Sequence, residues 1–272
     1  MTSYLERSQG RIAYEVQGKG PLLICLPAGG DLRSSYRYID HCLATSGYRV
    51  ATIDLRGLGD SSSSWPSYSA QAVASDILAL IDELGERSAT LIASSVSCAA
   101  AVVAASQAPE RIDGLVLNGS FAQAAPAWKL QVIGNLALNP LFGRMAFLQF
   151  QSTLYRRKPL DFAAYRKQVS HMLSDPQRLR ALRLLFSEVG EWDSQIETIR
   201  VPTLICMGSH DRDFADPAGE AHKLAQRMRR ASARVQLFEG AGHYPYVEMP
   251  ERFLQHLHHF LSDSVYALER EV

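Results

Sequence analysis

Three polar residues that follow short apolar segments have the side chains that nucleophilic catalysis needs. Ser95 follows the apolar segment 89–93, Asp211 follows 201–207, and His243 lies just beyond 233–238. A serine is a weak nucleophile unless a base removes its proton and a third group orients that base. We therefore expect Ser95 to be the nucleophile, His243 its base and Asp211 the acid that orients the histidine.

Alternating strand and helix patterns predict the scaffold that brings these residues together. Apolar, β-branched segments alternate with helical patterns over 34–45, 70–84 and 96–108, which is typical of βαβ units. Because most strand segments are apolar on both sides, we predict an α/β fold, a mostly parallel eight-stranded sheet with helices on both faces. The strand segments are 3–9, 11–17, 21–27, 48–54, 89–94, 112–119, 201–208 and 233–240. Sites in such sheets gather at the carboxyl ends of the strands.

The strand pattern stops in the middle of the chain. Amphipathic helical patterns replace it there, and prolines divide them into short helices, because proline suits a first helical turn and breaks a helix interior. We therefore predict a core domain of residues 1–120 and 198–272, with a helical cap inserted at 121–197.

The segment around Ser95 is a strand-to-helix turn with a recognisable sequence. It reads Ala93-Ser94-Ser95-Val96-Ser97 and resembles the nucleophile elbow of the α/β-hydrolase family, G-x-S-x-G, with Ala93 and Ser97 in place of the two glycines. In that elbow the serine projects above the sheet edge, and the N–H of the next residue faces developing negative charge. The resemblance implies that Ser95 is the nucleophile and Val96 one oxyanion donor.

Two more segments resemble motifs of the same family. Residues 240–243 read GAGH, similar to the family's G-x-G-H loop, and 208–211 read GSHD, similar to its strand-G-x-x-D ending. The order serine, aspartate, histidine is the one that this fold uses. Asp213 is an alternative to Asp211 as the acid.

The second oxyanion donor is expected in the loop after segment 21–27. The family usually has His-Gly there, and this chain has Pro27-Ala28 followed by Gly29. Since the donor is a backbone amide, Gly29 can pair with Val96. A nearby match to D-x-R-G-x-G-x-S at 54–61 implies a structural turn, and we leave it out of the catalytic set.

Candidate substrate-binding residues are Ser94, beside the nucleophile, and apolar residues of the cap. Trp128 and Phe147 head the cap candidates, which also include Met145, Phe150, Tyr155 and Phe186. Packing of the cap against the core is the alternative role for each of them.

No metal or cofactor is expected. His256, His258 and His259 are spaced so that a helix does not place all three on one face. No glycine-rich phosphate cradle follows a strand. The predicted chemistry is therefore cofactor-independent.

The composition favours a small-molecule substrate over a macromolecular partner. The 272 residues include 28 basic and 28 acidic side chains, so no overall field attracts nucleic acid or a membrane. No signal peptide or spanning segment is recognised, and we expect a cytoplasmic protein, monomer or homodimer.

The resemblance implies a serine hydrolase acting on a small, largely apolar carboxylic ester, lactone or thioester through an acyl-enzyme on Ser95. Similar sites on this fold also belong to C–C bond hydrolases, lyases and slow-turnover receptors. The triad alone does not separate these alternatives.

Overall fold

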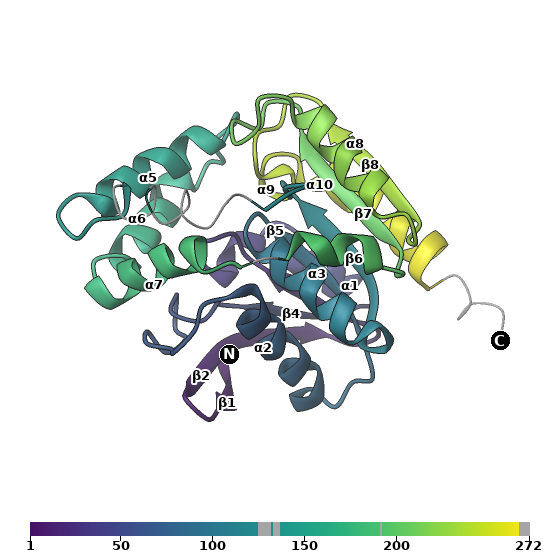
Figure 1. The fold of residues 1–272 in the computed structure, drawn as a ribbon, viewed down its shortest axis with the longest axis horizontal. Helices are drawn as coiled ribbons and strands as arrows, with labels where there is room; N and C mark the ends of the chain where they lie inside the picture. Colours follow the sequence, from purple (N-terminus) through teal and green to yellow (C-terminus); the bar gives the residue numbers. More distant parts are fainter. Residues whose placement is uncertain (125–131, 133–136, 191, 267–272) are drawn as a thin grey trace.

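An eight-stranded sheet forms the centre of the computed structural model, which describes residues 1–124, 132, 137–190 and 192–266 (Figure 1). The strand order is β1-β2-β4-β3-β5-β6-β7-β8. β2 is antiparallel to both β1 and β4, and the neighbours from β4 to β8 are parallel. The predicted sheet is thus confirmed, with bounds β1 Ser3–Arg7, β2 Gly10–Gly18, β3 Leu22–Leu26, β4 Arg49–Ile53, β5 Ala89–Ser94, β6 Ile112–Asn118, β7 Thr203–Gly208 and β8 Ala233–Phe238.

Helices cover both faces of this sheet (Figure 1). Side chains of β3 alternate between two apolar cores, with Ile24 in one and Cys25 in the other. A strand buried on both faces must be apolar throughout, which explains the sequence LLICL. The first core is covered by α2 Ala70–Glu83, α3 Ser97–Gln107 and α8 Pro217–Arg227, and the second by α1 Asp40–Thr45, α9 Pro245–Glu248 and α10 Pro250–Phe260. Short helical turns complete the chain at η1 Arg33–Tyr36, η2 Pro109–Arg111, η3 Asp193–Thr198 and η4 Leu261–Val265.

The prediction of one helix over 34–45 is wrong for the first half of that segment. A tight turn, η1, comes first, and α1 begins only at Asp40. The backbone N–H of Ile39 bonds the carbonyl three residues back, at 2.9 Å. The physical reason lies in Tyr36, a fully buried side chain whose hydroxyl bonds the Leu26 and Ile92 carbonyls at 2.9 and 3.0 Å. The backbone is therefore held close to the end of β3, off the axis of a continuous helix.

Three helices follow β6 in the sequence and lie beside one another at one end of the molecule (Figure 1). They are α5 Gly143–Leu154, α6 Phe162–Met172 and α7 Pro176–Ser187, and we call them the cap helices. They fall within the segment predicted as a cap, whose limits at 121 and 197 stay a prediction. None of the described helices is both long enough and apolar enough to cross a bilayer.

Candidate active site

Ser95 occupies a strained turn between β5 and α3. Its φ is +56°, and it is the one non-glycine residue with positive φ among those the structure describes. Backbone bonds hold it on both sides: its N–H donates to the Asn118 carbonyl at 2.8 Å, and its carbonyl accepts from Cys98 N–H at 2.9 Å. Such a conformation costs free energy and persists where the surroundings enforce it. This is the geometry expected of a nucleophile elbow.

His243 and Asp211 form a fully buried pair. His243 Nδ1 lies 2.7 Å from Asp211 Oδ2, and both side chains have no exposed surface. The other oxygen of Asp211 accepts the Asp213 N–H at 3.0 Å. Asp213 itself is farther away, with Oδ2 3.7 Å from His243 Nδ1. Of the two predicted acids, Asp211 therefore has the contact that orients the imidazole.

Gly119 makes room for this pair, a role that was not predicted from the sequence. It follows β6 with φ +57°, and a Cβ there would lie 2.6 Å from His243 Cε1 and 3.3 Å from Asp211 Oδ2. Only glycine meets both conditions, because its φ can be positive and no side chain occupies the histidine's space.

The neighbouring carboxylates make the imidazole of His243 a stronger base than an ordinary histidine. Burial by itself disfavours the imidazolium, but the Asp211 carboxylate and its hydrogen bond, with Asp213 and Asp31, raise the pKa of His243 to about 9. Nε2 is buried, and no residue that the structure describes hydrogen-bonds to it. The same is true of the Ser95 hydroxyl. Catalytic hydrogen bonds often tighten only once substrate is bound.

Two unused backbone donors lie next to Ser95. Neither Gly29 N–H nor Val96 N–H donates to an acceptor within the described part of the chain. The two residues are adjacent, since a Cβ on Gly29 would lie 3.0 Å from Val96 Cγ1. Backbone N–H groups inside proteins are almost always paired. These two amides can therefore serve an oxyanion.

A mostly apolar cavity of about 360 Å³ opens beside these groups. Ser95, Gly29 and Val96 all line it. Ser94 does not, because its side chain is fully buried at the end of β5, and Trp128 lies outside the described residues. The aromatic part of the wall consists of Phe121, Phe147, Phe150, Phe186, Trp192 and Tyr244. Of the other cap candidates, Met145 is mostly exposed and Tyr155 does not line the cavity.

Comparisons with known proteins identify the family. The model of the alpha/beta hydrolase family matches residues 23–256. The chain belongs to the alpha/beta hydrolase family. Its sequence is 28% identical over 229 residues to a putative carbamate hydrolase RutD of Caulobacter sp. (strain K31), covering 80% of this chain and 82% of that protein.

Two further matches cover nearly the whole chain. It is 25% identical over 267 residues to a 2-hydroxy-6-oxononadienedioate/2-hydroxy-6-oxononatrienedioate hydrolase of Paraburkholderia phymatum, covering 92% of this chain and 91% of that protein. The solved enol-lactonase from Burkholderia xenovorans LB400 is similar with a TM-score of 0.84 at 21% identity, over 96% of this chain and 100% of that one. The matches support a hydrolase with the α/β-hydrolase fold.

In this hydrolase, Ser97 has a role that the glycine of G-x-S-x-G cannot have. Its hydroxyl accepts Ser94 N–H at 3.1 Å and lies 3.0 Å from the Leu26 carbonyl, to which it can donate. Leu26 ends β3, directly before the loop of residues 27–31 that contains Gly29. The substituted elbow of this hydrolase is therefore tied to the loop that supplies the second free amide.

Asp31 ends this loop and was not predicted as a site residue. Its buried Oδ1 accepts hydrogen bonds from Gln151 Nε2 at 2.6 Å and from the Tyr165 hydroxyl at 2.9 Å, both on cap helices. A hydrogen bond from the Tyr244 side chain also stabilises the charged form of this carboxyl group. Burial raises the pKa of Asp31 to about 6, although these bonds and the charge of His243 act in the opposite direction. The hydrolase thus holds a second buried carboxyl group close to its histidine.

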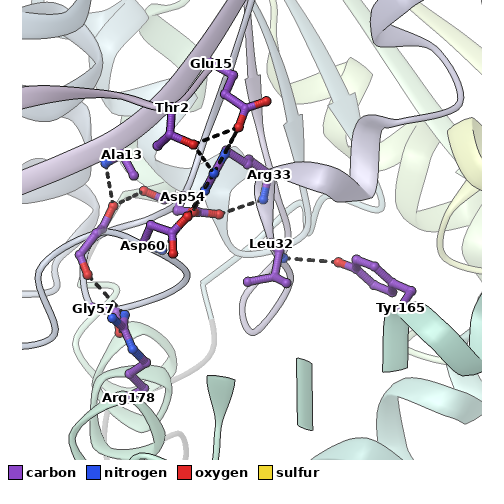
Figure 2. A network of polar contacts seen from close by, with 11 residues as sticks. Thr2, Ala13, Glu15, Leu32, Arg33, Asp54, Gly57, Asp60, Tyr165 and Arg178 are labelled. Atoms are coloured by element: carbon purple, nitrogen blue, oxygen red, sulfur yellow. Dashed lines mark hydrogen bonds and ion pairs between the residues drawn. The ribbon is translucent and has the colours of Figure 1, made fainter. Parts of the chain in front are cut away.

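Arg33 organises a separate polar network beneath the cap (Figure 2). It pairs with Glu15 at 3.0 Å, with Asp60 at 2.9 Å and with the buried Asp54. Asp54 also accepts the backbone N–H groups of Arg33 and Asp60, at 2.7 and 2.9 Å. In the hydrolase, the turn at residues 54–61 is therefore held to strand and loop residues of the core through Arg33.

The same network is joined to the cap helices (Figure 2). Leu32 N–H donates to the Tyr165 hydroxyl at 3.1 Å, and the Arg178 guanidinium donates to the Ser61 carbonyl at 3.1 Å. Leu32 directly follows the loop that carries Gly29, so its bond to Tyr165 ties the end of that loop to a cap helix.

Among the described residues, one group of side chains is close enough together to hold a metal ion: Asp211, Asp213 and His243. Their donor atoms lie within 4.8 Å of one another. His243 Nδ1 and Asp211 Oδ2 already share a hydrogen bond at 2.7 Å, which is the arrangement of an orienting acid and its base.

Proposed function

We propose that this chain is a cofactor-independent serine hydrolase that cleaves a small, largely apolar carboxylic ester through an acyl-enzyme on Ser95. The observation that carries the proposal is the φ of +56° at Ser95, beside the cavity. Backbone strain of this kind gathers at functional sites. The buried pair of His243 and Asp211, 2.7 Å apart, supports the same assignment.

Acylation would begin with Ser95 Oγ attacking the ester carbonyl carbon while His243 Nε2 takes its proton. The N–H groups of Gly29 and Val96 would stabilise the negative charge on the carbonyl oxygen. When the tetrahedral intermediate collapses, the bond to the leaving oxygen breaks and His243 returns the proton to it. The alcohol leaves, and Ser95 keeps the acyl group.

Deacylation would repeat these steps with water. His243 takes a proton from the water as the water oxygen attacks the acyl carbon. When this second tetrahedral intermediate collapses, the bond between the acyl carbon and Ser95 Oγ breaks, and His243 returns the proton to Ser95 Oγ. The acid product leaves, and the free enzyme is restored. Asp211 would keep the imidazole in the correct tautomer throughout.

The cavity lining supports an ester rather than the kind of substrate named for the dienedioate relative. That relative's name specifies a dioate, and carboxylates bind best to cationic side chains. The described residues that line the cavity include neither lysine nor arginine. An apolar ester requires only the apolar wall and the two N–H donors.

The experiment is active-site labelling with a fluorophosphonate, followed by peptide mapping. We expect label on Ser95 in the native protein, no label in Ser95→Ala, and a labelling rate at least about 100-fold lower in His243→Ala. Hydrolysis of 4-nitrophenyl butyrate is expected to fall in parallel.

Ser94→Ala is the matched control, because this neighbouring hydroxyl is buried and does not line the cavity. It is expected to keep both labelling and hydrolysis. Label on Ser94 or Ser97, or no label at all, would refute the assignment. A single stoichiometric burst without steady turnover would instead support the slow-turnover receptor.

A further inference from the structure

One carboxylate of the cavity wall is not used by the proposed triad. Asp213 lines the cavity, and its carboxylate accepts no hydrogen bond from any residue that the structure describes. The histidine 3.7 Å away already shares Nδ1 with Asp211. Its side chain is 16% exposed where it lines the cavity. A donor group of a bound molecule can therefore reach this carboxylate without displacing a hydrogen bond from a described residue.

The surroundings make this carboxylate costly to leave unpaired. Burial raises the pKa of Asp213, and the neighbouring Asp211 adds to this while His243 opposes it. Asp31 lies fully buried near the same histidine. No lysine or arginine is among the described lining residues to balance these groups. A ligand that brings a cation or a hydrogen-bond donor would relieve the imbalance, and a ligand carboxylate would increase it.

Much of the remaining wall is apolar and aromatic. Phe147 and Phe150 come from α5, and Phe186 comes from α7. Among the described residues that line the cavity of about 360 Å³, Asp213 is the one with a charged side chain, and a large apolar surface surrounds the polar residues Gln123, Ser95 and Tyr244. That combination fits a molecule with an apolar body and one donor group.

We propose that the substrate of this site is an apolar ester bearing an amino or hydroxyl group that donates to Asp213, and that Asp213 excludes esters carrying a free carboxylate. This rests on the proposed ester-hydrolase function of the same cavity. Asp213 would act as a specificity-determining residue, distinct from the acid that orients His243.

The test measures binding without turnover. In Ser95→Ala protein, titration calorimetry would compare three ligands of one shape: 4-phenylbutylamine, 4-phenylbutan-1-ol and 4-phenylbutyrate. We expect the amine and the alcohol to bind at least about tenfold more tightly than the carboxylate. Adding Asp213→Asn should bring all three dissociation constants within about threefold of one another, because it removes the charge and keeps the side-chain size.

The control is Asp82→Asn in the same Ser95→Ala background. Asp82 is an exposed carboxylate of α2 that pairs with Arg111 and does not line the cavity, so its removal should leave the order of affinities unchanged. Equal affinities before Asp213 is changed, an unaltered order after it, or no binding by any of the three would overturn the proposal. Failure of fluorophosphonate labelling would refute the ester-hydrolase function instead, since this binding order does not depend on Ser95.

Discussion

The cavity at Ser95 and the cavity at Arg33 differ most in how their polar groups are partnered. The Arg33 cavity is larger, about 850 Å³ against about 360 Å³, and Arg37 and Arg178 line it as well. Each of these three arginines has a partner: Asp54, Asp161 and the Ser61 carbonyl. In or near the wall of the Ser95 cavity, three groups instead form no hydrogen bond with a described residue: the Ser95 hydroxyl, His243 Nε2 and the Asp213 carboxylate.

This contrast indicates that the polar groups around Arg33 stabilise the fold, whereas those around Ser95 serve binding and catalysis. Paired charges contribute to the fold and leave little binding capacity, whereas buried groups without partners cost stability and are retained where a ligand or a reaction uses them. Changes around Ser95 should therefore reduce catalysis, and changes around Arg33 should reduce the free energy of unfolding.

The largest effect is expected from Asp211→Asn. We expect kcat for 4-nitrophenyl butyrate to fall on the order of 1,000-fold or more, since the histidine loses its orienting acid. Activity needs neutral His243, whose pKa Asp211 helps to raise to about 9. The acid limb of the remaining activity should therefore move to lower pH. Asp213→Asn, at 3.7 Å from the histidine, should cost tenfold or less. The reverse order of losses would make Asp213 the acid.

Gly119→Ala should have the next largest effect. The added Cβ would lie 2.6 Å from His243 Cε1. Relieving this clash requires a shift of about 1 Å, and a shift of that size is expected to lower kcat about 100-fold. Gly85→Ala is the matched control, because Gly85 also has positive φ, +69°, but open space around it. Both variants should lose roughly 1 kcal/mol of stability from the strained backbone. If the two variants kept the same kcat, Gly119 would have no part in positioning the histidine.

The sequence was sufficient to predict the sheet and the order of the catalytic candidates. Strands such as 22–26 and 89–94 are buried on both faces, and this burial requires the apolar runs that made them recognisable. Ser95, Asp211 and His243 could be selected because each lies shortly after a predicted strand, at the strand ends where sites of such sheets gather. The contacts between their side chains, however, depend on the folded structure and could not be predicted from the sequence.

Gly119 and Asp31 show where sequence reasoning ends. Gly119 looks like an ordinary turn residue, and its contact with His243 joins positions 124 residues apart in the chain. Asp31 follows two glycines and looks like a surface loop residue, yet Gln151 and Tyr165 bury it from 120 and 134 positions away. Helical periodicity likewise cannot distinguish Phe147, which lines the cavity, from Met145, which is mostly exposed.

In the Arg33 cavity, Arg33→Met should lower stability and leave kcat within about threefold of native. It would leave the fully buried Asp54 without its cation, and loss of one partner of a buried pair costs about 3 kcal/mol. Asp60→Asn removes an exposed partner of the same arginine and should cost less than about 1 kcal/mol. Urea unfolding and steady-state kinetics measure the two quantities. A large loss of kcat in folded Arg33→Met protein would contradict the conclusion that the Arg33 cavity contributes to stability and not to catalysis.

The smallest effect concerns Asp31, the buried carboxyl group that has no cation. Its pKa in the folded protein is about 6, against 3.8 for an ordinary aspartate. Between these values the folded state binds more protons than the unfolded state, so this group makes the native protein less stable as pH rises from about 4 to about 6. Asp31→Asn removes the titration and can still accept the bonds from Gln151 and Tyr165. The stability of the variant relative to native should therefore be higher at pH 7.5 than at pH 4.5 by about 2 kcal/mol.

Asp161→Asn is the control for this pH dependence, because the pKa of Asp161 is lowered in the folded protein whereas that of Asp31 is raised. Hydrogen bonds from Arg37, opposed by burial, lower the pKa of Asp161 to about 2, so both its folded and unfolded values lie below pH 4.5. Its stabilising effect is fully present at both pH values, and the difference between this variant and native should hardly change between them. A flat pH profile for Asp31→Asn as well would mean that Asp31 is ionised without cost.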